Sequence, residues 1–175
     1  MLIEIEETYN PNVRNFYLNT PVLAQGAAEY ASLKTKGSSE CAKNILNVGG
    51  VLSVLILPDM ISVVKKEDAD FRALEPQIMA EIVDCDFFKL KNFDFSKQDK
   101  KALTEALVEA KIRPFLKRDG GDIEVLGIKD GVLAVRLKGR CQGCPHANQT
   151  LKNMVEATLK KYVSDILSVQ EESGK

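Results

Sequence analysis

The stretch GDIEVLGIKDGVLAVRLKGRCQGCP, residues 121–145, decides the fold of the C-terminal half of the chain. Asp130-Gly131 stands between two β-rich runs, residues 122–128 and 132–138, and an Asp-Gly pair in that setting is typical of a tight β-hairpin. A Cys-x-x-Cys segment follows the second run, so its two thiols are expected in a loop at the end of a strand.

Helices are expected on both sides of this hairpin. Before it, apolar residues recur at helical spacing until Pro114, which should bend or end the helix ahead of a turn at residues 119–122. After it, one apolar stripe covers four helical turns, and a short strand is expected at 165–169, so the predicted order is αββαβ. The stripes consist of Leu103, Ala106, Leu107 and Ala110 before the hairpin and Leu151, Met154, Val155, Thr158, Leu159 and Tyr162 after it.

The N-terminal half predicts a second unit, a small mixed sheet with helices. Residues 2–7 alternate as an edge strand does, and the β-rich runs 51–57 and 60–65 meet at a Pro-Asp turn and form a predicted hairpin. Helical spacing of apolar residues predicts one helix beginning near Ser38 and another over residues 68–85.

We therefore predict an α+β chain of two small domains. Residues 86–95 break the helical periodicity and form the predicted linker between an N-terminal domain at 1–85 and a C-terminal domain at 96–175. A chain of 175 residues, 45% of them hydrophobic, is long enough to build two cores.

Composition narrows the classes of function. The 24 lysines and arginines are balanced by 25 acidic residues spread along the chain, which argues against a nucleic-acid-binding protein. The first residues are acidic and alternating, and no apolar run approaches the roughly 18 residues that cross a bilayer. We expect a soluble cytoplasmic protein that binds neither membrane nor nucleic acid.

Cys141 and Cys144 are the main candidate functional residues. Pro145 follows at the expected first position of a helix, where backbone N–H groups and the helix dipole favour a thiolate at Cys144. Three cationic side chains are expected to add positive charge around it: Lys138, Arg140 and Lys152. The setting favours a ligand or redox role for the two thiols over a buried, inert one.

The Cys141 and Cys144 pair has three possible roles: a redox dithiol, ligands of an iron–sulfur cluster, or ligands of a structural zinc ion. A thioredoxin-like dithiol is disfavoured because only about 30 residues follow Cys144, too few for the further strands of that fold. Zinc sites and iron–sulfur clusters usually take four protein ligands, and this motif supplies two. A two-fold dimer would complete the set, around either a bridging cluster or a structural zinc ion. Cys41 and Cys85 are expected to be small buried hydrophobes, neither ligands nor a disulfide.

His146 and the pair Asp119 and Asp122 are further candidate functional residues, and each has a simpler structural explanation. His146 is the sole histidine and follows Cys144 by two residues, but a solvent-facing position on the first helical turn explains it without a ligand role. Asp119 and Asp122 could be a carboxylate pair, but the glycines between them favour a turn.

The C-terminal half resembles the NifU-like domain of Nfu-type iron–sulfur proteins, from residue 96 to about 170. The resemblance rests on IRPFL, RDGGD, LKG, CQGCP and TLKN, at residues 112–116, 118–122, 137–139, 141–145 and 150–153. The N-terminal half resembles the Nfu N-terminal domain through Thr8-Tyr9-Asn10-Pro11-Asn12 and the hairpin at 59–63.

The chain departs from the family pattern at four places. Tyr9 stands where the family has proline, and Phe71 where it usually has tryptophan. Arg140 replaces a small residue, and residues 146–149 replace a serine-rich run. The cysteines that match the family's ligands are intact.

The resemblance implies an iron–sulfur cluster scaffold or carrier, which is not an enzyme. Its cofactor would be a [4Fe-4S] cluster, or alternatively [2Fe-2S], held by the thiolates of Cys141 and Cys144. The implied partners are a cluster donor scaffold, apo iron–sulfur proteins as recipients, and a second copy of the chain in a cluster-bridged homodimer.

Overall fold

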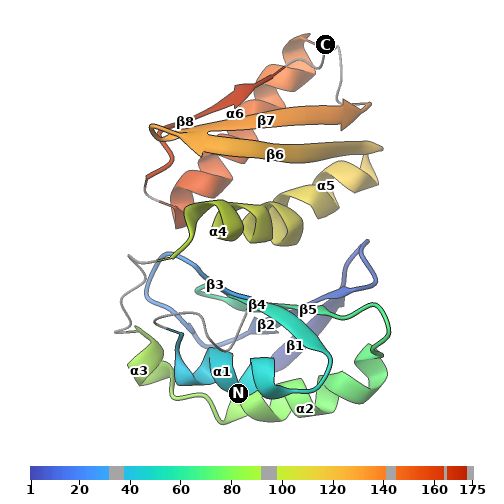
Figure 1. The fold of residues 1–175 in the computed structure, drawn as a ribbon, viewed down its shortest axis with the longest axis vertical. Coiled ribbons are helices and arrows are strands. Elements are labelled where there is room, and N and C mark those ends of the chain that lie inside the picture. The colour runs from blue at the N-terminus through green and yellow to red at the C-terminus, as the bar shows by residue number, and fades with distance from the viewer. Residues whose placement is uncertain (32–37, 92–97, 141–144, 164, 173–175) are drawn as a thin grey trace. The chain divides into compact units, whose positions relative to one another are not determined.

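The computed structural model describes residues 1–31, 38–91, 98–140, 145–163 and 165–172, without the side chains of Lys91 and of residues 145–148. The chain divides into two compact units, Met1–Gln98 and Asp99–Lys175 (Figure 1). Both combine helices with an antiparallel or mixed sheet, so the predicted α+β class with two units is confirmed.

The first unit is built on a five-stranded antiparallel sheet with the order β1-β2-β5-β4-β3. The predicted edge strand and the predicted hairpin are both present, and two strands that the sequence did not indicate complete the sheet. The strands are β1 (Ile3–Glu7), β2 (Val13–Leu18), β3 (Ala28–Tyr30), β4 (Val51–Ile56) and β5 (Met60–Lys65).

Two helices, α1 (Glu40–Asn47) and α2 (Phe71–Val83), cover one face of this sheet (Figure 1). Each begins at a capping side chain: the Ser39 hydroxyl accepts from the Ala42 N–H at 3.1 Å, and the Asp70 carboxylate accepts from the Arg72 N–H at 3.0 Å. A short helix, α3 (Phe87–Lys91), lies within the predicted linker, and its Leu90 belongs to the core of the first unit.

Phe71 begins α2 and is buried in that core. The Arg14 guanidinium lies 5.0 Å from the centre of its ring, and the Lys65 ammonium lies 5.7 Å from it. Phenylalanine therefore provides both the apolar volume and the cation-binding ring face at this position.

The structure corrects the prediction for two cysteines. Cys41 is buried, as expected, but its sulfur is bonded to Cys85 in a disulfide. The first turn of α1 and the segment after α2 come together on one face of the sheet, which brings the two Cα atoms to 5.0 Å. The pair is separated by 44 residues, so only the packing of the two helices reveals it.

The second unit has the predicted αββαβ order. Its hairpin consists of β6 (Gly121–Lys129) and β7 (Val132–Gly139), and β8 (Ser168–Glu171) pairs with β7 in parallel. Asp130 and Gly131 have φ values of 50° and 77°, as a two-residue hairpin turn requires. The strand β8 begins three residues later than predicted. Helix α6 (Pro145–Tyr162) precedes it and buries Val155, Leu159 and Tyr162 of the predicted stripe.

Pro114 was expected to bend or end the first helix of this unit, and the helical segment continues past it. Helix α4 (Lys100–Leu107) runs into a π-helical turn, η1 (Val108–Ile112), and then into α5 (Arg113–Arg118). Proline cannot donate the hydrogen bond that an unbroken α-helix needs, and a π-turn absorbs the extra residue. The Arg113 N–H donates to the Val108 carbonyl, five residues back, so Pro114 alters the helix without stopping it.

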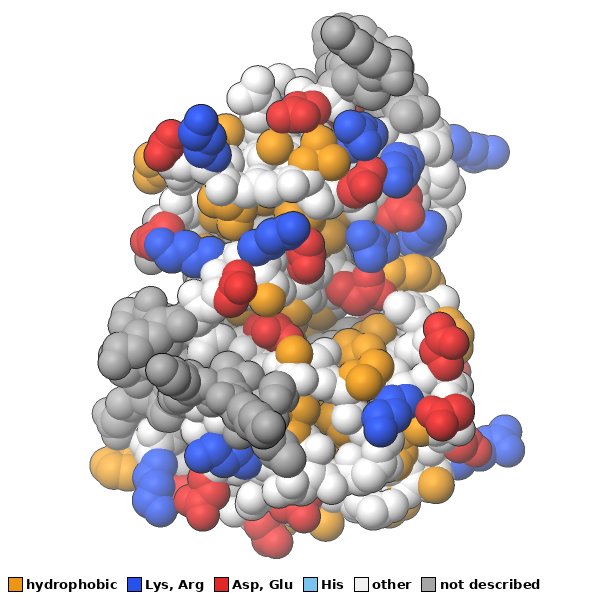
Figure 2. Space-filling model, in the orientation of Figure 1, with side chains coloured by type: hydrophobic (Ala, Val, Ile, Leu, Met, Phe, Trp, Pro, Cys, Tyr) orange, Lys and Arg blue, Asp and Glu red, His pale blue; other side chains and the backbone are white. Residues whose placement is uncertain are grey.

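Basic and acidic side chains are interspersed on the face drawn in Figure 2. None of the helices in the described part of the chain is both long and apolar enough to cross a membrane.

Candidate functional site

Cys141 and Cys144 lie outside the described residues, and so does the side chain of His146. The described residues form the frame on either side of the thiols. β7 ends at Gly139 and Arg140 follows it, while α6 begins at Pro145 directly after Cys144. The predicted strand-to-helix setting of the Cys-x-x-Cys segment is therefore present at both of its ends.

The start of the Cys-x-x-Cys segment lies against the turn at residues 119–122, through contacts that involve Gly120, Gly121 and Gly139. Gly121 pairs with Gly139 across the hairpin, and the Arg140 N–H donates to the Gly120 carbonyl at 3.2 Å. Gly139 has φ of 68°, and a Cβ atom there would lie 2.5 Å from the Gly120 oxygen. Only glycine allows this approach, so the Gly-Gly turn and the segment that leads to Cys141 form one structural unit.

The predicted turn is also present. The Gly120 N–H donates to the Lys117 carbonyl at 3.1 Å and Gly120 has φ of 78°, which a left-handed turn position requires. Asp119 ends α5 as its C-cap. The two aspartates thus belong to a turn at the end of a helix, and no group of three or more potential metal-ligating side chains occurs among the described residues.

Asp122 is held by two cations at the base of this turn. Its carboxylate lies 2.8 Å from the Lys117 ammonium and 3.0 Å from the Arg113 guanidinium, and it accepts from the Ile123 N–H at 2.8 Å. Partial burial acts to raise the pKa of Asp122, but the Lys117 hydrogen bond, the Ile123 N–H and the Arg113 charge together hold it below its usual value. Asp122 is therefore an anchoring carboxylate that stays ionised.

Arg113 connects this anchor to the helix and the sheet. It pairs with Glu109 one helical turn away, and its guanidinium donates to the Ile123 carbonyl at 2.8 Å. This network was not predicted from the sequence. The only signal in the sequence was an i, i+4 Glu-Arg pair within a helix, which is common on helix surfaces and carries little specificity.

Lys138, one of the three cations expected near the thiols, pairs with an acidic side chain of the hairpin. Its ammonium lies 2.9 Å from the Glu124 carboxylate, which also lies 3.3 Å from the Arg136 guanidinium. The hydrogen bond and charge of Lys138 hold the pKa of Glu124 below its usual value. Lys138 and Arg136 therefore share one carboxylate on the hairpin, and Arg140 is the cation adjacent to Cys141 in the chain.

Helix α6 is fixed at the end away from the thiols. The Glu156 carboxylate accepts from the Val169 N–H at 3.0 Å and lies 2.6 Å from the Lys160 ammonium, and it thereby ties the helix to β8. The Lys160 hydrogen bond and the Val169 N–H hold the pKa of Glu156 below its usual value. Cys144 directly precedes Pro145, the first residue of α6. This helix buries one face and is hydrogen-bonded to β8 through its C-terminal half.

Comparison with known proteins agrees with both halves of the resemblance. The model of the NifU-like domain matches residues 104–170, and the model described as scaffold protein Nfu/NifU N terminal matches residues 3–88. The chain belongs to the Nfu/NifU family.

Relatives in this family align along nearly the whole chain. NifU-like protein 4, mitochondrial, of Arabidopsis thaliana is 32% identical over 98% of this chain and 66% of its own length. The human NFU1 iron-sulfur cluster scaffold homolog, mitochondrial, is 31% identical over 98% of this chain and 72% of its own length. The chain therefore spans about two thirds of the length of these Nfu relatives. Among solved structures, the crystal structure of protein SAV1430 from Staphylococcus aureus is 29% identical, with a TM-score of 0.42 over 47% of this chain and 99% of its own.

Proposed function

We propose that this chain is an iron–sulfur cluster scaffold or carrier that binds a cluster through the thiolates of Cys141 and Cys144 and passes it to apo-proteins. The observation that carries the proposal is the alignment of nearly the whole chain with a protein named as an iron–sulfur cluster scaffold homolog. The frame around the thiols supports it, because a glycine-lined strand end and a helix start hold the two ends of the Cys-x-x-Cys segment.

The number of ligands favours a shared site. A cubane [4Fe-4S] cluster takes four protein thiolates, and one chain offers two in this motif. Cys41 and Cys85 cannot complete the set while they are bonded to each other. We infer that two chains each contribute Cys141 and Cys144 and that the cluster bridges them across a two-fold axis.

Such a site is suited to transfer. Each chain provides only two of the ligands, so the thiolates of a recipient protein can replace them in steps. The chain's own contribution is then to hold the thiolates at the start of α6, where the N–H groups and the dipole of the helix stabilise negative charge. Binding and release of cargo, without turnover of a substrate, are the reaction that this arrangement supports.

Anaerobic reconstitution with iron and sulfide tests the proposal on the full chain. Broad visible absorption, with Mössbauer spectra and iron and sulfide counts of a [4Fe-4S] cluster, is the expected result, and the cluster should move to an apo iron–sulfur protein. Cys141→Ser and Cys144→Ser should each abolish stable loading, because each removes two of the four thiolates in a symmetric dimer. The matched control, Cys41→Ser with Cys85→Ser, should load normally. A colourless dimer that retains zinc, or full loading of the Cys144→Ser chain, would contradict the proposal.

A further inference from the structure

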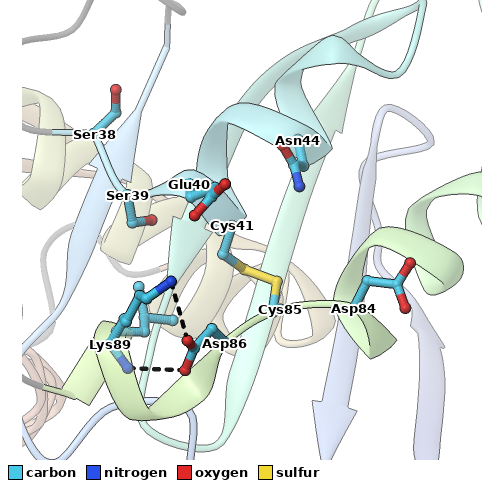
Figure 3. A pocket seen from close by; sticks show the side chains of 10 residues that line it. Ser38, Ser39, Glu40, Cys41, Asn44, Asp84, Cys85, Asp86 and Lys89 are labelled. Atoms are coloured by element: carbon cyan, nitrogen blue, oxygen red, sulfur yellow. Dashed lines mark hydrogen bonds and ion pairs between the residues drawn. A yellow bond between two sulfur atoms is a disulfide. The ribbon is translucent and has the colours of Figure 1, made fainter.

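The Cys41–Cys85 disulfide lies in the wall of a pocket of about 420 Å³ in the first unit. Figure 3 shows the bridge between the first turn of α1 and the segment that follows α2, with Glu40 and Asp86 close to it. The proposed cluster chemistry does not use this sulfur pair, so the disulfide needs an account of its own.

The two cysteines differ in exposure. Cys41 is 5% exposed, whereas Cys85 is only partly buried and packs at the edge of the hydrophobic core. A thiol from solution must approach along the line of the S–S bond, and Cys85 is the more exposed of the two bonded residues. An entering nucleophile is therefore directed to Cys85.

The two sulfurs also differ as leaving groups. Cys41 is the second residue of α1, where the N–H groups of the first turn and the positive end of the helix dipole stabilise an anion. Cys85 follows the C-cap of α2, at the negative end of a helix. Attack at Cys85 expels the sulfur that is better able to carry the charge, so leaving-group stability and accessibility favour the same direction.

The main chain around Cys85 is held independently of the bridge. The Cys85 N–H donates to the Ile82 carbonyl at 3.3 Å, and the Cys85 carbonyl accepts from the Phe87 N–H at 3.1 Å. Its sulfur lies 3.2 Å from the Glu81 carbonyl oxygen, so a reduced Cys85 thiol has an acceptor in place. The local structure can accommodate the reduced state as well as the oxidised one.

The rim of the pocket is acidic. Its described lining includes the carboxylates of Glu40, Asp84 and Asp86 and the ammonium of Lys89, which lies 3.3 Å from Asp86. The Lys89 N–H also donates to Asp86 at 3.1 Å and holds the pKa of that carboxyl below its usual value. No ion pair is formed by Glu40 or Asp84 within the described part of the chain, and their carboxylates repel an anionic thiolate and attract one that carries positive charge.

We propose that the Cys41–Cys85 disulfide is a reversible redox-exchange site for a dithiol reductant with basic groups beside its nucleophilic sulfur. The reductant's thiolate attacks the Cys85 sulfur and forms a mixed disulfide, while the S–S bond breaks and its electron pair leaves on Cys41. The second thiol of the reductant then attacks the first sulfur of the reductant and releases Cys85. Two electrons and two protons pass from the dithiol, which becomes a disulfide, to the protein pair.

The direction of attack can be tested on the full chain carrying Cys141→Ser and Cys144→Ser, which leaves only this pair. The oxidised chain is treated briefly with the monothiol cysteamine, quenched in acid, alkylated and mapped by mass spectrometry. The cysteamine adduct should lie on Cys85 and the alkyl group on Cys41, in roughly tenfold excess over the opposite arrangement. An adduct mainly on Cys41, or no reaction until urea unfolds the chain, would overturn the proposal.

The charge preference is tested by comparing cysteamine with 3-mercaptopropionate, each corrected for its rate with a neutral small disulfide. Cysteamine should react several-fold faster at low salt, with the difference nearly lost at about 1 M salt. Glu40→Gln with Asp84→Asn should also remove the preference, while Asp86 and Lys89 stay in place. Equal corrected rates in the unsubstituted pocket would contradict a cationic reductant.

Reversibility requires that the reduced chain stay folded. The reduced protein should keep its circular dichroism spectrum and return to the disulfide with an oxidised dithiol, because the core of the first unit does not depend on the bridge alone. Loss of the fold on reduction would make the bridge purely structural and would overturn the proposal. None of these measurements involves a cluster, so their outcome is independent of the proposed carrier function.

Discussion

Gly139 is the residue on which the path of the chain into the Cys-x-x-Cys segment depends. It combines a left-handed φ with a backbone approach that leaves no room for a Cβ atom. We expect Gly139→Ala to lower the free energy of unfolding of the second unit by roughly 1–3 kcal/mol. Gly127→Ala in the same hairpin is the matched control, since its Cβ meets nothing within 4 Å, and should change stability by less than about 1 kcal/mol. Urea unfolding, followed through NMR signals of β6 and β7, measures the free energy of unfolding of both variants. Equal losses of stability in Gly139→Ala and Gly127→Ala would contradict the steric argument.

Asp122 gives the second unit a pH-dependent contribution to stability. Because the folded state holds its pKa below the unfolded value, the contribution is present above about pH 4 and is lost as the pH falls through the folded pKa. Asp122→Asn should therefore lower the free energy of unfolding by about 1 kcal/mol at pH 7. The difference from the unsubstituted chain should shrink between pH 5 and pH 3. A difference that is constant over this range would show that the carboxylate charge is not the cause.

Some residue contacts cannot be found from the sequence. The Cys41–Cys85 bridge joins positions 44 residues apart, with no motif spacing to pair them, and it exists because α1 and α2 share one face of a sheet. The Asp122 anchor likewise needs the helix and the hairpin to meet. By contrast, the Asp130-Gly131 turn was predictable, because its geometry is dictated by two adjacent residues.

Among the elements, those with strong local signals were predicted, whereas pairing decided the existence of β3, which was missed, and the start of β8, which was misplaced. The hairpins and the longer helices carry their own periodicity or turn residues. Strand β3 has three residues and exists through its pairing with β4, and β8 begins where its parallel alignment with β7 allows, at Val132 and Ser168. Helix α3 is too short to show a helical period. The Cys-x-x-Cys segment was the strongest functional signal in the sequence, and its ligand role stays a prediction.

The tether between α6 and β8 gives a prediction about elements. Glu156→Ala removes the charged acceptor of the Val169 N–H, so exchange of this amide with solvent should become about tenfold faster. Lys160→Ala is the control: it removes the ion-pair partner but leaves the acceptor, and it should change the Val169 rate little. Hydrogen exchange read by NMR provides the comparison. An equal acceleration in both variants would assign the effect to the ion pair instead.

For the whole molecule, the proposed shared ligation makes cluster loading and dimer formation one linked equilibrium. A bridging cluster binds two chains and stabilises the dimer by mass action, so the dimer fraction should follow the cluster-to-chain ratio up to one cluster per two chains. The dimer brings two copies of Arg140 towards one site, and the negative charge of a thiolate-ligated cluster between them offsets their repulsion. Analytical ultracentrifugation of apo, reconstituted and chelator-treated chains should show monomer, dimer and monomer again. A loaded chain that sediments as a monomer would mean that each chain completes its ligand set without a second copy, and bridging would have to be abandoned.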